Sequence, residues 1–253
     1  MDFTDFKLYG LIGYPLGHSF SLPYFTKKFE QERINAEYRN FPLENIEKFR
    51  ELVKREHKLV GLNVTVPYKQ KIIPFLDALH PTARSIGAVN TIFFCRKGEQ
   101  LSLLGYNSDV IGFERSLKEH LTEEHKQALV LGSGGSSKAV KYVLESLGIN
   151  YKVVSRQRGE GVLSYDQLDQ EIMESFTLII NTTPLGMFPK VDAAPNLPYK
   201  FITPRHLLFD LVYNPEKTLF LNLGQEQGAK IINGSDMLIY QAEGSWEIWN
   251  KKR

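Results

Sequence analysis

"ALVLGSGGSSKAVKYVLESLG", residues 128–148, joins an apolar run, a glycine-rich turn and a segment with the apolar spacing of a helix. The pattern predicts a buried strand, a tight turn and an amphipathic helix, in that order. Gly132 permits the tight turn, and Gly134 lets the backbone approach a pyrophosphate at the amino end of the helix. Ser137 stands where the general dinucleotide-binding pattern has its third glycine, so an ordinary tight turn is the alternative interpretation.

The end of the following strand indicates which nucleotide this turn would hold. The strand pattern covers residues 151–156, and no acidic residue lies between Tyr151 and Gly159. An NAD site usually places a carboxylate there to accept from the ribose hydroxyls, whereas Arg156 and Arg158 suit a 2′-phosphate. The sequence therefore favours NADP over NAD, with two solvated surface arginines as the alternative.

Strand and helix patterns alternate along the rest of the chain. Apolar runs or period-two alternation predict strands at residues 8–13, 36–41, 61–66, 88–94, 101–106, 177–182 and 206–212. Helical spacing predicts helices at residues 22–34, 44–56, 109–121 and 236–249. This order predicts an α/β protein of two units with a boundary near residue 108, and a mostly parallel sheet in the first unit. A cleft between two such units is a usual place for a ligand.

The composition narrows the class of protein. With 253 residues, 42% apolar and 24% charged, the chain has the make-up of a globular protein of one large or two modest domains. A net charge of +2 with scattered cations does not favour nucleic acid. The sequence shows neither a secretory signal nor an apolar stretch long enough to span a membrane, so we expect neither. We also expect no metal site, because the six histidines lack ligand spacing. The single cysteine, Cys95, excludes an intrachain disulfide and indicates a reducing cytoplasm.

Polar side chains gather where several strands of the first unit are predicted to end. In "GLNVTVPYKQK" (61–71) an alternating strand carries Asn63 and Thr65, stops at Pro67, and is followed by Lys69. Ligands of open α/β sheets lie beyond the carboxyl ends of strands, so these residues are expected in one pocket with Ser19, Ser21, Asn90 and Asp109. Hydroxyls, amides, one cation and one carboxylate suit a small polyhydroxylated carboxylic acid. Alone, each residue has a plainer interpretation as a local cap or a solvated side chain.

These motifs, in this order, resemble the shikimate dehydrogenase family over nearly the whole chain. The matching pieces are "IGYPLGHSFS" (12–21), "GLNVTVPYK" (61–69), "GAVNT" (87–91), "GYNSD" (105–109), "GSGGSS" (132–137), "SR" (155–156), "NTTPLGM" (181–187), "DLVYNP" (210–215) and "NGSDMLIYQA" (233–242). The resemblance implies NADPH-dependent reduction of 3-dehydroshikimate to shikimate, in the pathway to chorismate and the aromatic amino acids. It also implies a substrate domain at 1–108 and 235–253, and a Rossmann-like NADP-binding domain at 109–234, with the C-terminal helix returning to the first domain.

The resemblance also assigns roles at the substrate. Ser19 and Ser21 would bind the substrate carboxylate, and Lys69 with Asp109 would form the catalytic pair. The ring hydroxyls would be held by Asn63, Thr65, Asn90 and Asp109, and the site would be closed by Tyr213 and Gln241. An ammonium beside the substrate ketone can stabilise the developing charge and donate a proton, which is the role we expect for Lys69.

For the cofactor, the resemblance implies three groups of residues. The pyrophosphate would be carried by Gly132, Ser133, Gly134, Gly135 and Ser136, and the adenosine phosphate by Ser155, Arg156 and Gln157. The nicotinamide would lie near Leu211, Gly234 and Met237. Asp236 replaces a glycine of the family pattern and brings a negative charge near the expected nicotinamide.

Three alternatives stay open on the sequence. The first is a dehydrogenase that accepts quinate as well as shikimate, with relaxed use of NAD. The second is a regulatory nucleotide-binding protein without catalysis, against which the presence of both Lys69 and Asp109 argues. The third is a binding protein for small acids without a cofactor, against which the glycine turn argues. The sequence leaves monomer and homodimer open.

Overall fold

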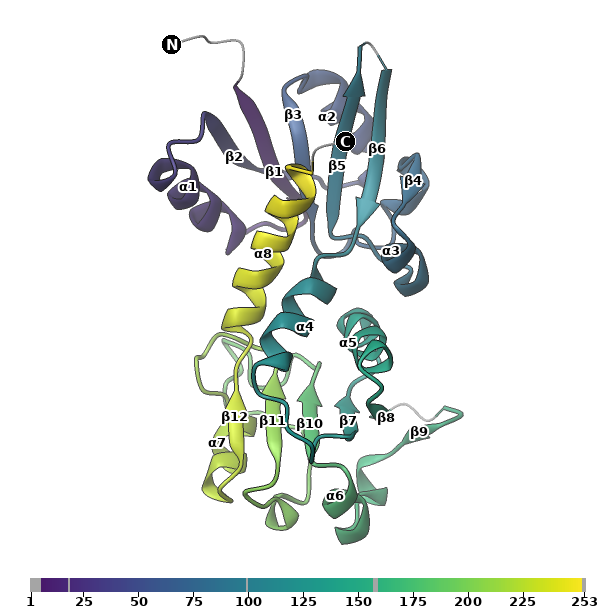
Figure 1. Cartoon of the computed structure of the whole chain (residues 1–253), viewed down its shortest axis with the longest axis vertical. Helices are drawn as coiled ribbons and strands as arrows, with labels where there is room; N and C mark the ends of the chain where they lie inside the picture. The colour runs from purple at the N-terminus through teal and green to yellow at the C-terminus, as the bar shows by residue number, and fades with distance from the viewer. Residues whose placement is uncertain (1–5, 18, 99, 157–158, 252–253) are drawn as a thin grey trace. The chain divides into compact units, whose positions relative to one another are not determined.

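The computed structural model describes residues 6–17, 19–98, 100–156 and 159–251. The chain divides into two compact units, and each is built on its own sheet (Figure 1). The first unit is Met1–Ser108 with Ala242–Arg253, and the second is Asp109–Gln241. The second boundary between the units therefore falls inside the C-terminal helix, between Gln241 and Ala242, whereas it was predicted between residues 234 and 235.

The first unit contains a six-stranded mixed sheet in the order β2-β1-β3-β5-β6-β4. Its strands are β1 (Lys7–Gly13), β2 (Ala36–Pro42), β3 (Leu59–Val64), β4 (Ala78–Leu79), β5 (Thr91–Lys97) and β6 (Gln100–Tyr106). Strand β1 pairs in parallel with β2 and β3, and β4 pairs in parallel with β6. Strand β5 runs antiparallel to both β3 and β6. The polar residues that follow β3 are thus next to the start of β5.

The C-terminal helix α8 (Ser235–Trp249) contributes its last turns to the core of the first unit. The indole of Trp249 donates to the carbonyl oxygen of Ile92 over 3.0 Å. A Cβ on Gly61 would lie 2.3 Å from the Trp249 indole nitrogen, so only glycine lets the helix approach β3 this closely. Helix α1 (Ser21–Gln31) packs on the same turns, where Lys28 forms a 3.0 Å ion pair with Glu243. The predicted return of this helix to the first unit is confirmed.

Two shorter helices complete the first unit, α2 (Phe49–Arg55) and α3 (Pro81–Ile86). The helix predicted at 44–56 is divided, because Asn45 caps a separate 3₁₀ turn at Ile46–Lys48 by accepting from the Glu47 backbone N–H over 3.0 Å. The strand predicted at 88–94 begins only at Thr91. The backbone N–H of Val89 instead donates to the carbonyl of Lys69 over 2.7 Å, which ties this segment to the turn after β3.

The second unit contains a six-stranded, wholly parallel sheet in the order β12-β11-β10-β7-β8-β9. Its strands are β7 (Gln127–Leu131), β8 (Asn150–Val154), β9 (Val162–Leu163), β10 (Leu178–Asn181), β11 (Leu207–Asp210) and β12 (Lys230–Ile232). Its helices are α4 (Asp109–Lys118), α5 (Gly135–Ser146), α6 (Gln170–Ser175) and α7 (Leu219–Glu226). Strands β7, β10 and β11 are buried along nearly their whole length, as expected for a parallel sheet covered on both faces. The predicted Rossmann-like fold is confirmed.

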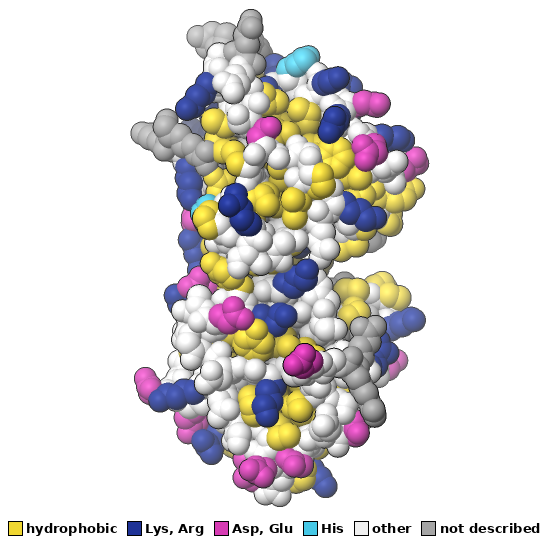
Figure 2. All heavy atoms as spheres, turned by 90° about the vertical axis from the view of Figure 1, so that its right-hand side faces the viewer, with side chains coloured by type: hydrophobic (Ala, Val, Ile, Leu, Met, Phe, Trp, Pro, Cys, Tyr) yellow, Lys and Arg dark blue, Asp and Glu magenta, His cyan; other side chains and the backbone are white. Residues whose placement is uncertain are grey.

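The first turns of α8 belong to this unit and pack on α4. A Cβ on Gly112 of α4 would lie 2.5 Å from the carbonyl oxygen of Met237, so the two helices approach each other at a glycine. None of the helices among the described residues is both long enough and apolar enough to cross a bilayer. On the face drawn in Figure 2, cationic and anionic side chains are interspersed and form no patch of one sign.

Candidate functional site

A cavity of about 800 Å³ opens in the second unit where several strands of the parallel sheet end. Five of the predicted cofactor residues line it: Gly132, Ser133, Gly134, Ser155 and Arg156. The other lining residues are Ser164, Tyr165, Asp166, Thr182, Thr183, Pro184, Leu185, Ala194 and Asn196. The carboxyl ends of strands are where open α/β sheets bind their ligands.

In the glycine turn between β7 and α5, the structure gives a physical reason for Gly132 and for Ser137. Gly132 has φ of +102°, a conformation that disfavours other residues, and a Cβ there would lie 2.9 Å from both Thr182 and Thr183. Gly134 precedes the first turn of α5 in an extended conformation. Ser137 is buried, and its hydroxyl donates to the Gly134 carbonyl over 2.6 Å. The serine that breaks the general pattern therefore closes the turn.

The arginine side of the cavity is built by two neighbouring strands. Ser155 follows β8, and its backbone N–H donates to the Leu163 carbonyl at the end of β9 over 2.9 Å. This register brings Tyr165 and Asp166 into the cavity that Arg156 lines. Asp166 is an acidic group that lies beyond the Tyr151–Gly159 stretch used to predict the cofactor. Gln157 and Arg158 lie outside the described residues.

The remaining predicted cofactor residues lie elsewhere in the second unit. Gly135 and Ser136 form the exposed first turn of α5. The backbone N–H of Gly234 donates to the Val212 carbonyl over 3.1 Å, and a Cβ on Gly234 would lie 2.3 Å from the Leu211 carbonyl oxygen. Gly234 therefore lies against Leu211, and Met237 follows in the first turn of α8. None of these three residues lines the 800 Å³ cavity.

In the first unit, two of the predicted substrate residues belong to one buried hydrogen-bond network. The side-chain amide of Asn63 donates to the Ser245 hydroxyl over 2.8 Å, and its oxygen accepts from the Tyr38 hydroxyl over 2.8 Å. The side-chain oxygen of Asn90 accepts from the Ser108 backbone N–H over 2.6 Å. The Ser245 and Ser108 hydroxyls lie 2.9 Å apart and join the two amides.

Of the two serines predicted to bind the carboxylate, Ser21 is the first residue of α1 and Ser19 lies two residues before it. The Ser21 side chain hydrogen-bonds the Tyr38 hydroxyl, and burial raises the pKa of that phenol. The Ser19 hydroxyl is buried and has no hydrogen-bond partner among the residues that the structure describes. An unpaired buried hydroxyl is costly unless a ligand completes it.

The predicted catalytic residues, Lys69 and Asp109, lie on segments that are hydrogen-bonded to Asn90 or to its neighbour Val89. The Lys69 carbonyl accepts from Val89, the neighbour of Asn90, and the turn between β3 and Lys69 is closed by the Tyr68 N–H donating to the Thr65 carbonyl over 2.9 Å. Asp109 begins α4 and directly follows Ser108, whose backbone Asn90 holds. Both predicted catalytic residues are therefore attached to segments that Asn90 and its neighbours fix. Tyr213, exposed after β11, and Gln241, half-buried in α8, belong to the second unit.

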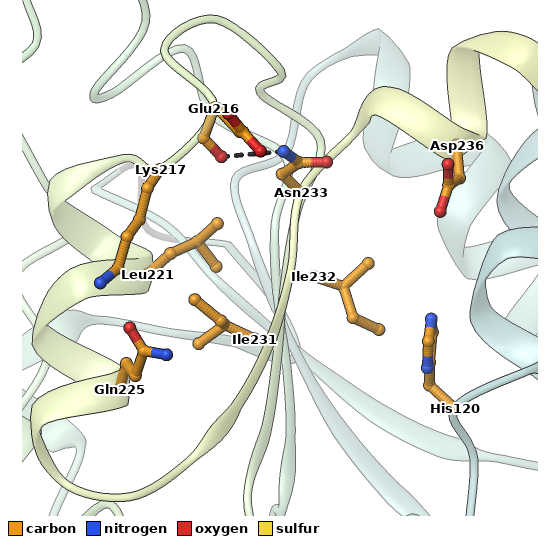
Figure 3. Close-up of a pocket in the computed structure, with 9 residues that line it drawn as sticks. All are labelled: His120, Glu216, Lys217, Leu221, Gln225, Ile231, Ile232, Asn233 and Asp236. Atoms are coloured by element: carbon orange, nitrogen blue, oxygen red, sulfur yellow. Dashed lines mark hydrogen bonds between the residues drawn. The ribbon is translucent and has the colours of Figure 1, made fainter.

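A second cavity, of about 580 Å³, lies along the edge strand β12. Figure 3 shows Lys217 and Gln225 on one side of the strand, and His120 and Asp236 on the other. Asp236, which the sequence analysis placed near the nicotinamide, thus lines this cavity. None of the residues predicted to bind substrate or cofactor lines it, and its mixture of carboxylates, one lysine, one histidine and aliphatic side chains favours no single class of ligand.

Sequence reasoning missed several polar residues of both sites. Tyr38, Thr91 and Ser245 lie in the network around Asn63. No quoted motif contains Tyr38 or Ser245, and Thr91 ends "GAVNT", where it was given no role. Thr182 and Thr183 belong to "NTTPLGM", a motif to which the sequence analysis gave no role for its threonines. Their position directly after a predicted buried strand was the signal that could have identified them.

A parallel sheet, a glycine turn before a helix and an arginine in the cavity define an α/β dinucleotide-binding protein. A family model described as the shikimate dehydrogenase substrate binding domain matches residues 11–92. "Shikimate dehydrogenase (NADP(+))" of Desulforamulus reducens is 36% identical over 95% of this chain and 88% of its own length. The chain belongs to the shikimate dehydrogenase family.

Further relatives and solved structures match nearly the whole chain. "Shikimate dehydrogenase (NADP(+))" of Methanococcus vannielii is 37% identical and covers 96% of this chain and 90% of its own. The solved structure of shikimate 5-dehydrogenase from Thermus thermophilus, in complex with NADP(H) and shikimate, has a TM-score of 0.83 at 28% identity, covering 96% of this chain and 93% of that one. That from Listeria monocytogenes, in complex with shikimate and NAD, has a TM-score of 0.86 at 26% identity, covering 98% and 92%.

Proposed function

We propose that this chain interconverts 3-dehydroshikimate and shikimate with NADP(H), in the shikimate pathway. The observation that carries this proposal is the full-length similarity to relatives named for that activity, at 36% and 37% identity. The chain retains a residue of the required chemistry at every position that the family resemblance assigns to catalysis.

The residues of the second unit fit a phosphorylated dinucleotide. The turn from Gly132 to Gly134 leads into α5, and Gly135 and Ser136 form the amino end of that helix, where unpaired backbone N–H groups and the helix dipole favour a pyrophosphate. Arg156 lines the same cavity and suits a 2′-phosphate. Ser155 and Gln157 would assist it, and Leu211, Gly234 and Met237 would lie near the nicotinamide. When bound, NADPH supplies the hydride for the substrate ketone.

The first unit supplies the groups that hold the acid. Ser19 and Ser21 bind the substrate carboxylate in this proposal. Its support is the buried Ser19 hydroxyl, which has no hydrogen-bond partner within the described part of the chain. The ring hydroxyls bond to Asn63, Thr65, Asn90 and Asp109. Tyr213 and Gln241 would also bind the substrate, as the family resemblance implies. The rigid network behind Asn63 and Asn90 favours binding because it orders these amides before the substrate arrives.

Lys69 and Asp109 carry the proton chemistry. During reduction, negative charge develops on the ketone oxygen, and the Lys69 ammonium stabilises this charge and donates a proton to it. Asp109 orients the ammonium and the neighbouring hydroxyl. In the oxidative direction, neutral Lys69 accepts the hydroxyl proton as the hydride leaves the ring carbon. The reaction thus needs one proton donor and one hydride donor.

A second candidate is use of NAD beside NADP, and one observation favours it. Asp166 lines the same cavity as Arg156, and a carboxylate there can accept from ribose hydroxyls and repel a 2′-phosphate. We further propose a cytoplasmic location, supported by the single cysteine, and a monomer or homodimer.

The test is NADPH oxidation, followed by absorbance, with purified protein and 3-dehydroshikimate. NADH, and quinate with either oxidised cofactor, are run in parallel. Turnover that depends on 3-dehydroshikimate and prefers NADPH is expected. Folded protein that binds NADPH but turns over none of these substrates would contradict the catalytic proposal and favour a regulatory role.

A further inference from the structure

A buried carboxylate lies between two loops of the proposed cofactor site. Asp210 ends β11 and is wholly buried. One of its oxygens accepts from the side-chain amide of Asn181 and from the backbone N–H of Val212, each over 3.0 Å. The other accepts from the Thr218 hydroxyl over 2.6 Å. A charge this deeply buried persists only when donors surround it.

The first of these partners connects Asp210 to the cavity. Asn181 ends β10 and is the register partner of Asp210 in the parallel sheet. Its side-chain oxygen accepts from both the backbone N–H and the hydroxyl of Thr183, over 3.0 and 2.6 Å. Thr183 lines the 800 Å³ cavity and packs against the glycine turn at Gly132. A single side chain, Asn181, thus separates the carboxylate from the cavity wall.

The second partner connects Asp210 to the opposite loop. Asp210 accepts from the backbone N–H of Val212. Val212 is flanked by Leu211, which is assigned to the nicotinamide, and by Tyr213, which is assigned to the substrate. The Val212 carbonyl in turn accepts from Gly234 over 3.1 Å. The third partner, Thr218, has a different task, because it is the N-cap residue of α7 and lies outside the cavity lining.

The charge state of Asp210 agrees with this arrangement. All three partners donate, so the ionised carboxylate can accept from each, whereas the protonated acid would place a hydrogen among donors. Burial raises the pKa of Asp210 to about 6, which leaves the carboxylate ionised at neutral pH. The charge of Asp210 also acts on Tyr199, since burial and then that charge raise the pKa of the Tyr199 phenol.

We infer that Asp210 is a positioning residue for the cofactor: acting through Asn181 it holds Thr183 against the glycine turn, and through Val212 it holds the Leu211–Tyr213 loop. Hydrogen bonds to a charged acceptor are roughly twice as strong as neutral ones, so the carboxylate fixes both loops more firmly than an amide would. This inference rests on the proposed use of NADP(H) and names a residue that touches neither cofactor nor substrate.

The test measures NADPH binding without substrate, by fluorescence titration, in wild type, Asp210→Asn and Thr218→Val. Asp210→Asn keeps the shape but replaces a charged acceptor by a neutral amide, and we expect the Kd for NADPH to rise about five- to tenfold. Thr218→Val removes a bond to the same carboxylate at the α7 cap, so it lowers thermal stability but leaves the Kd unchanged. Both variants are first compared by circular dichroism.

The outcomes separate positioning from simple stabilisation. An unchanged Kd in folded Asp210→Asn, or an equal rise in Thr218→Val, overturns the inference. If Asp210→Asn does not fold, Asn181→Ser is the test variant, because it breaks the same link and leaves Asp210 its bonds to Val212 and Thr218. A raised Kd is again expected, and an unchanged Kd overturns the inference. Failure of the wild type to bind NADPH would contradict the proposed function itself.

Discussion

The side-chain amide of Asn63 donates to the hydroxyl of Ser245 over 2.8 Å and so ties strand β3 to the last turns of helix α8. The same hydroxyl lies within 2.9 Å of Thr91 and of Ser108. One serine on the C-terminal helix therefore joins three segments that carry proposed substrate residues.

Ser245→Ala is expected to weaken shikimate binding. The change leaves the buried amide of Asn63 without its shortest acceptor, which we expect to cost about 1–3 kcal/mol of unfolding free energy. The KM for shikimate should rise more than the KM for NADP⁺, because the affected amide faces the substrate in our proposal. Ser146→Ala, on the exposed end of α5, is the control and should change neither value. A larger effect on the cofactor than on shikimate would contradict this assignment.

Gly132→Ala is expected to abolish tight NADPH binding. The positive φ costs a non-glycine residue about 1–2 kcal/mol, and the new methyl group also meets Thr182 and Thr183 at 2.9 Å. Gly148→Ala is a matched control, since Gly148 also has a positive φ, +68°, but open space around a Cβ. Titration should show a raised Kd for NADPH in the first variant only, while both lose stability. Equal Kd values in the two variants would show that the turn does not hold the cofactor.

Arg156→Gln is expected to reduce the preference for NADPH. Loss of a charged donor to a 2′-phosphate costs about 1.5–3 kcal/mol, equivalent to a rise in the KM for NADPH of roughly 10- to 100-fold. The KM for NADH should hardly change. Arg205→Gln removes an exposed arginine paired with Glu124 at 3.3 Å and serves as control. If Arg156→Gln affects NADH and NADPH equally, the 2′-phosphate is bound elsewhere.

Asp166→Asn should act in the opposite direction. Removing a negative charge from the cavity that Arg156 lines should lower the KM for NADPH and raise that for NADH. Steady-state kinetics with both cofactors measure the change. An unaltered ratio of kcat/KM values would argue against a part for Asp166 in cofactor choice.

Buried His206 predicts a loss of stability in acid. Its Nδ1 accepts from the Thr203 backbone N–H over 3.0 Å, and its Nε2 donates to the Met173 carbonyl over 2.9 Å, so the fold requires the neutral ring. Burial lowers the pKa of His206 below its usual range. Because the unfolded chain then binds the proton more readily, stability is present above pH of about 6.5 and is lost as the pH falls below it.

Denaturant unfolding between pH 7.5 and 5.5 measures this loss. The free energy of unfolding should fall less in His206→Gln, which cannot be protonated in this range. In His57→Gln, which changes an exposed residue of the first unit, it should fall as in the wild type. Asp210 has a raised pKa and contributes with the opposite sign, but it is present in every variant and cancels in the comparison. If the free energy of unfolding falls equally with pH in wild type and His206→Gln, His206 does not cause the loss.

Sequence periodicity predicted most of the longer strands and helices in their order, but not α3, α6, α7 or β12. The strand, turn and helix at 128–148 appear as β7, the Gly132 turn and α5, because burial on both faces of a parallel strand leaves an uninterrupted apolar run. The start of β5 was predicted three residues too early, because Val89 bonds to Lys69 rather than into the sheet. Such a bond between distant segments has no local signal.

The same limit explains which site residues were missed. Asp166 reaches the cavity through the register of β8 with the short strand β9, a two-residue element that no pattern marks. Ser245 reaches Asn63 because Gly61 lets Trp249 approach β3, which is visible only once the helix is placed. Residues directly after long apolar strands could be predicted, whereas residues brought in by packing could not.

The most direct test of the account is the turnover of Lys69→Ala beside its binding of shikimate. Lys71→Ala, an exposed lysine of the same segment, is the matched control. Removing a general acid slows the chemical step by about 10²–10⁴-fold. We predict a kcat reduced to that extent in Lys69→Ala alone, with the Kd for shikimate, measured by calorimetry, within about tenfold of wild type. A kcat near that of the wild type, in protein that still binds shikimate, would contradict the assignment of Lys69 as the proton donor.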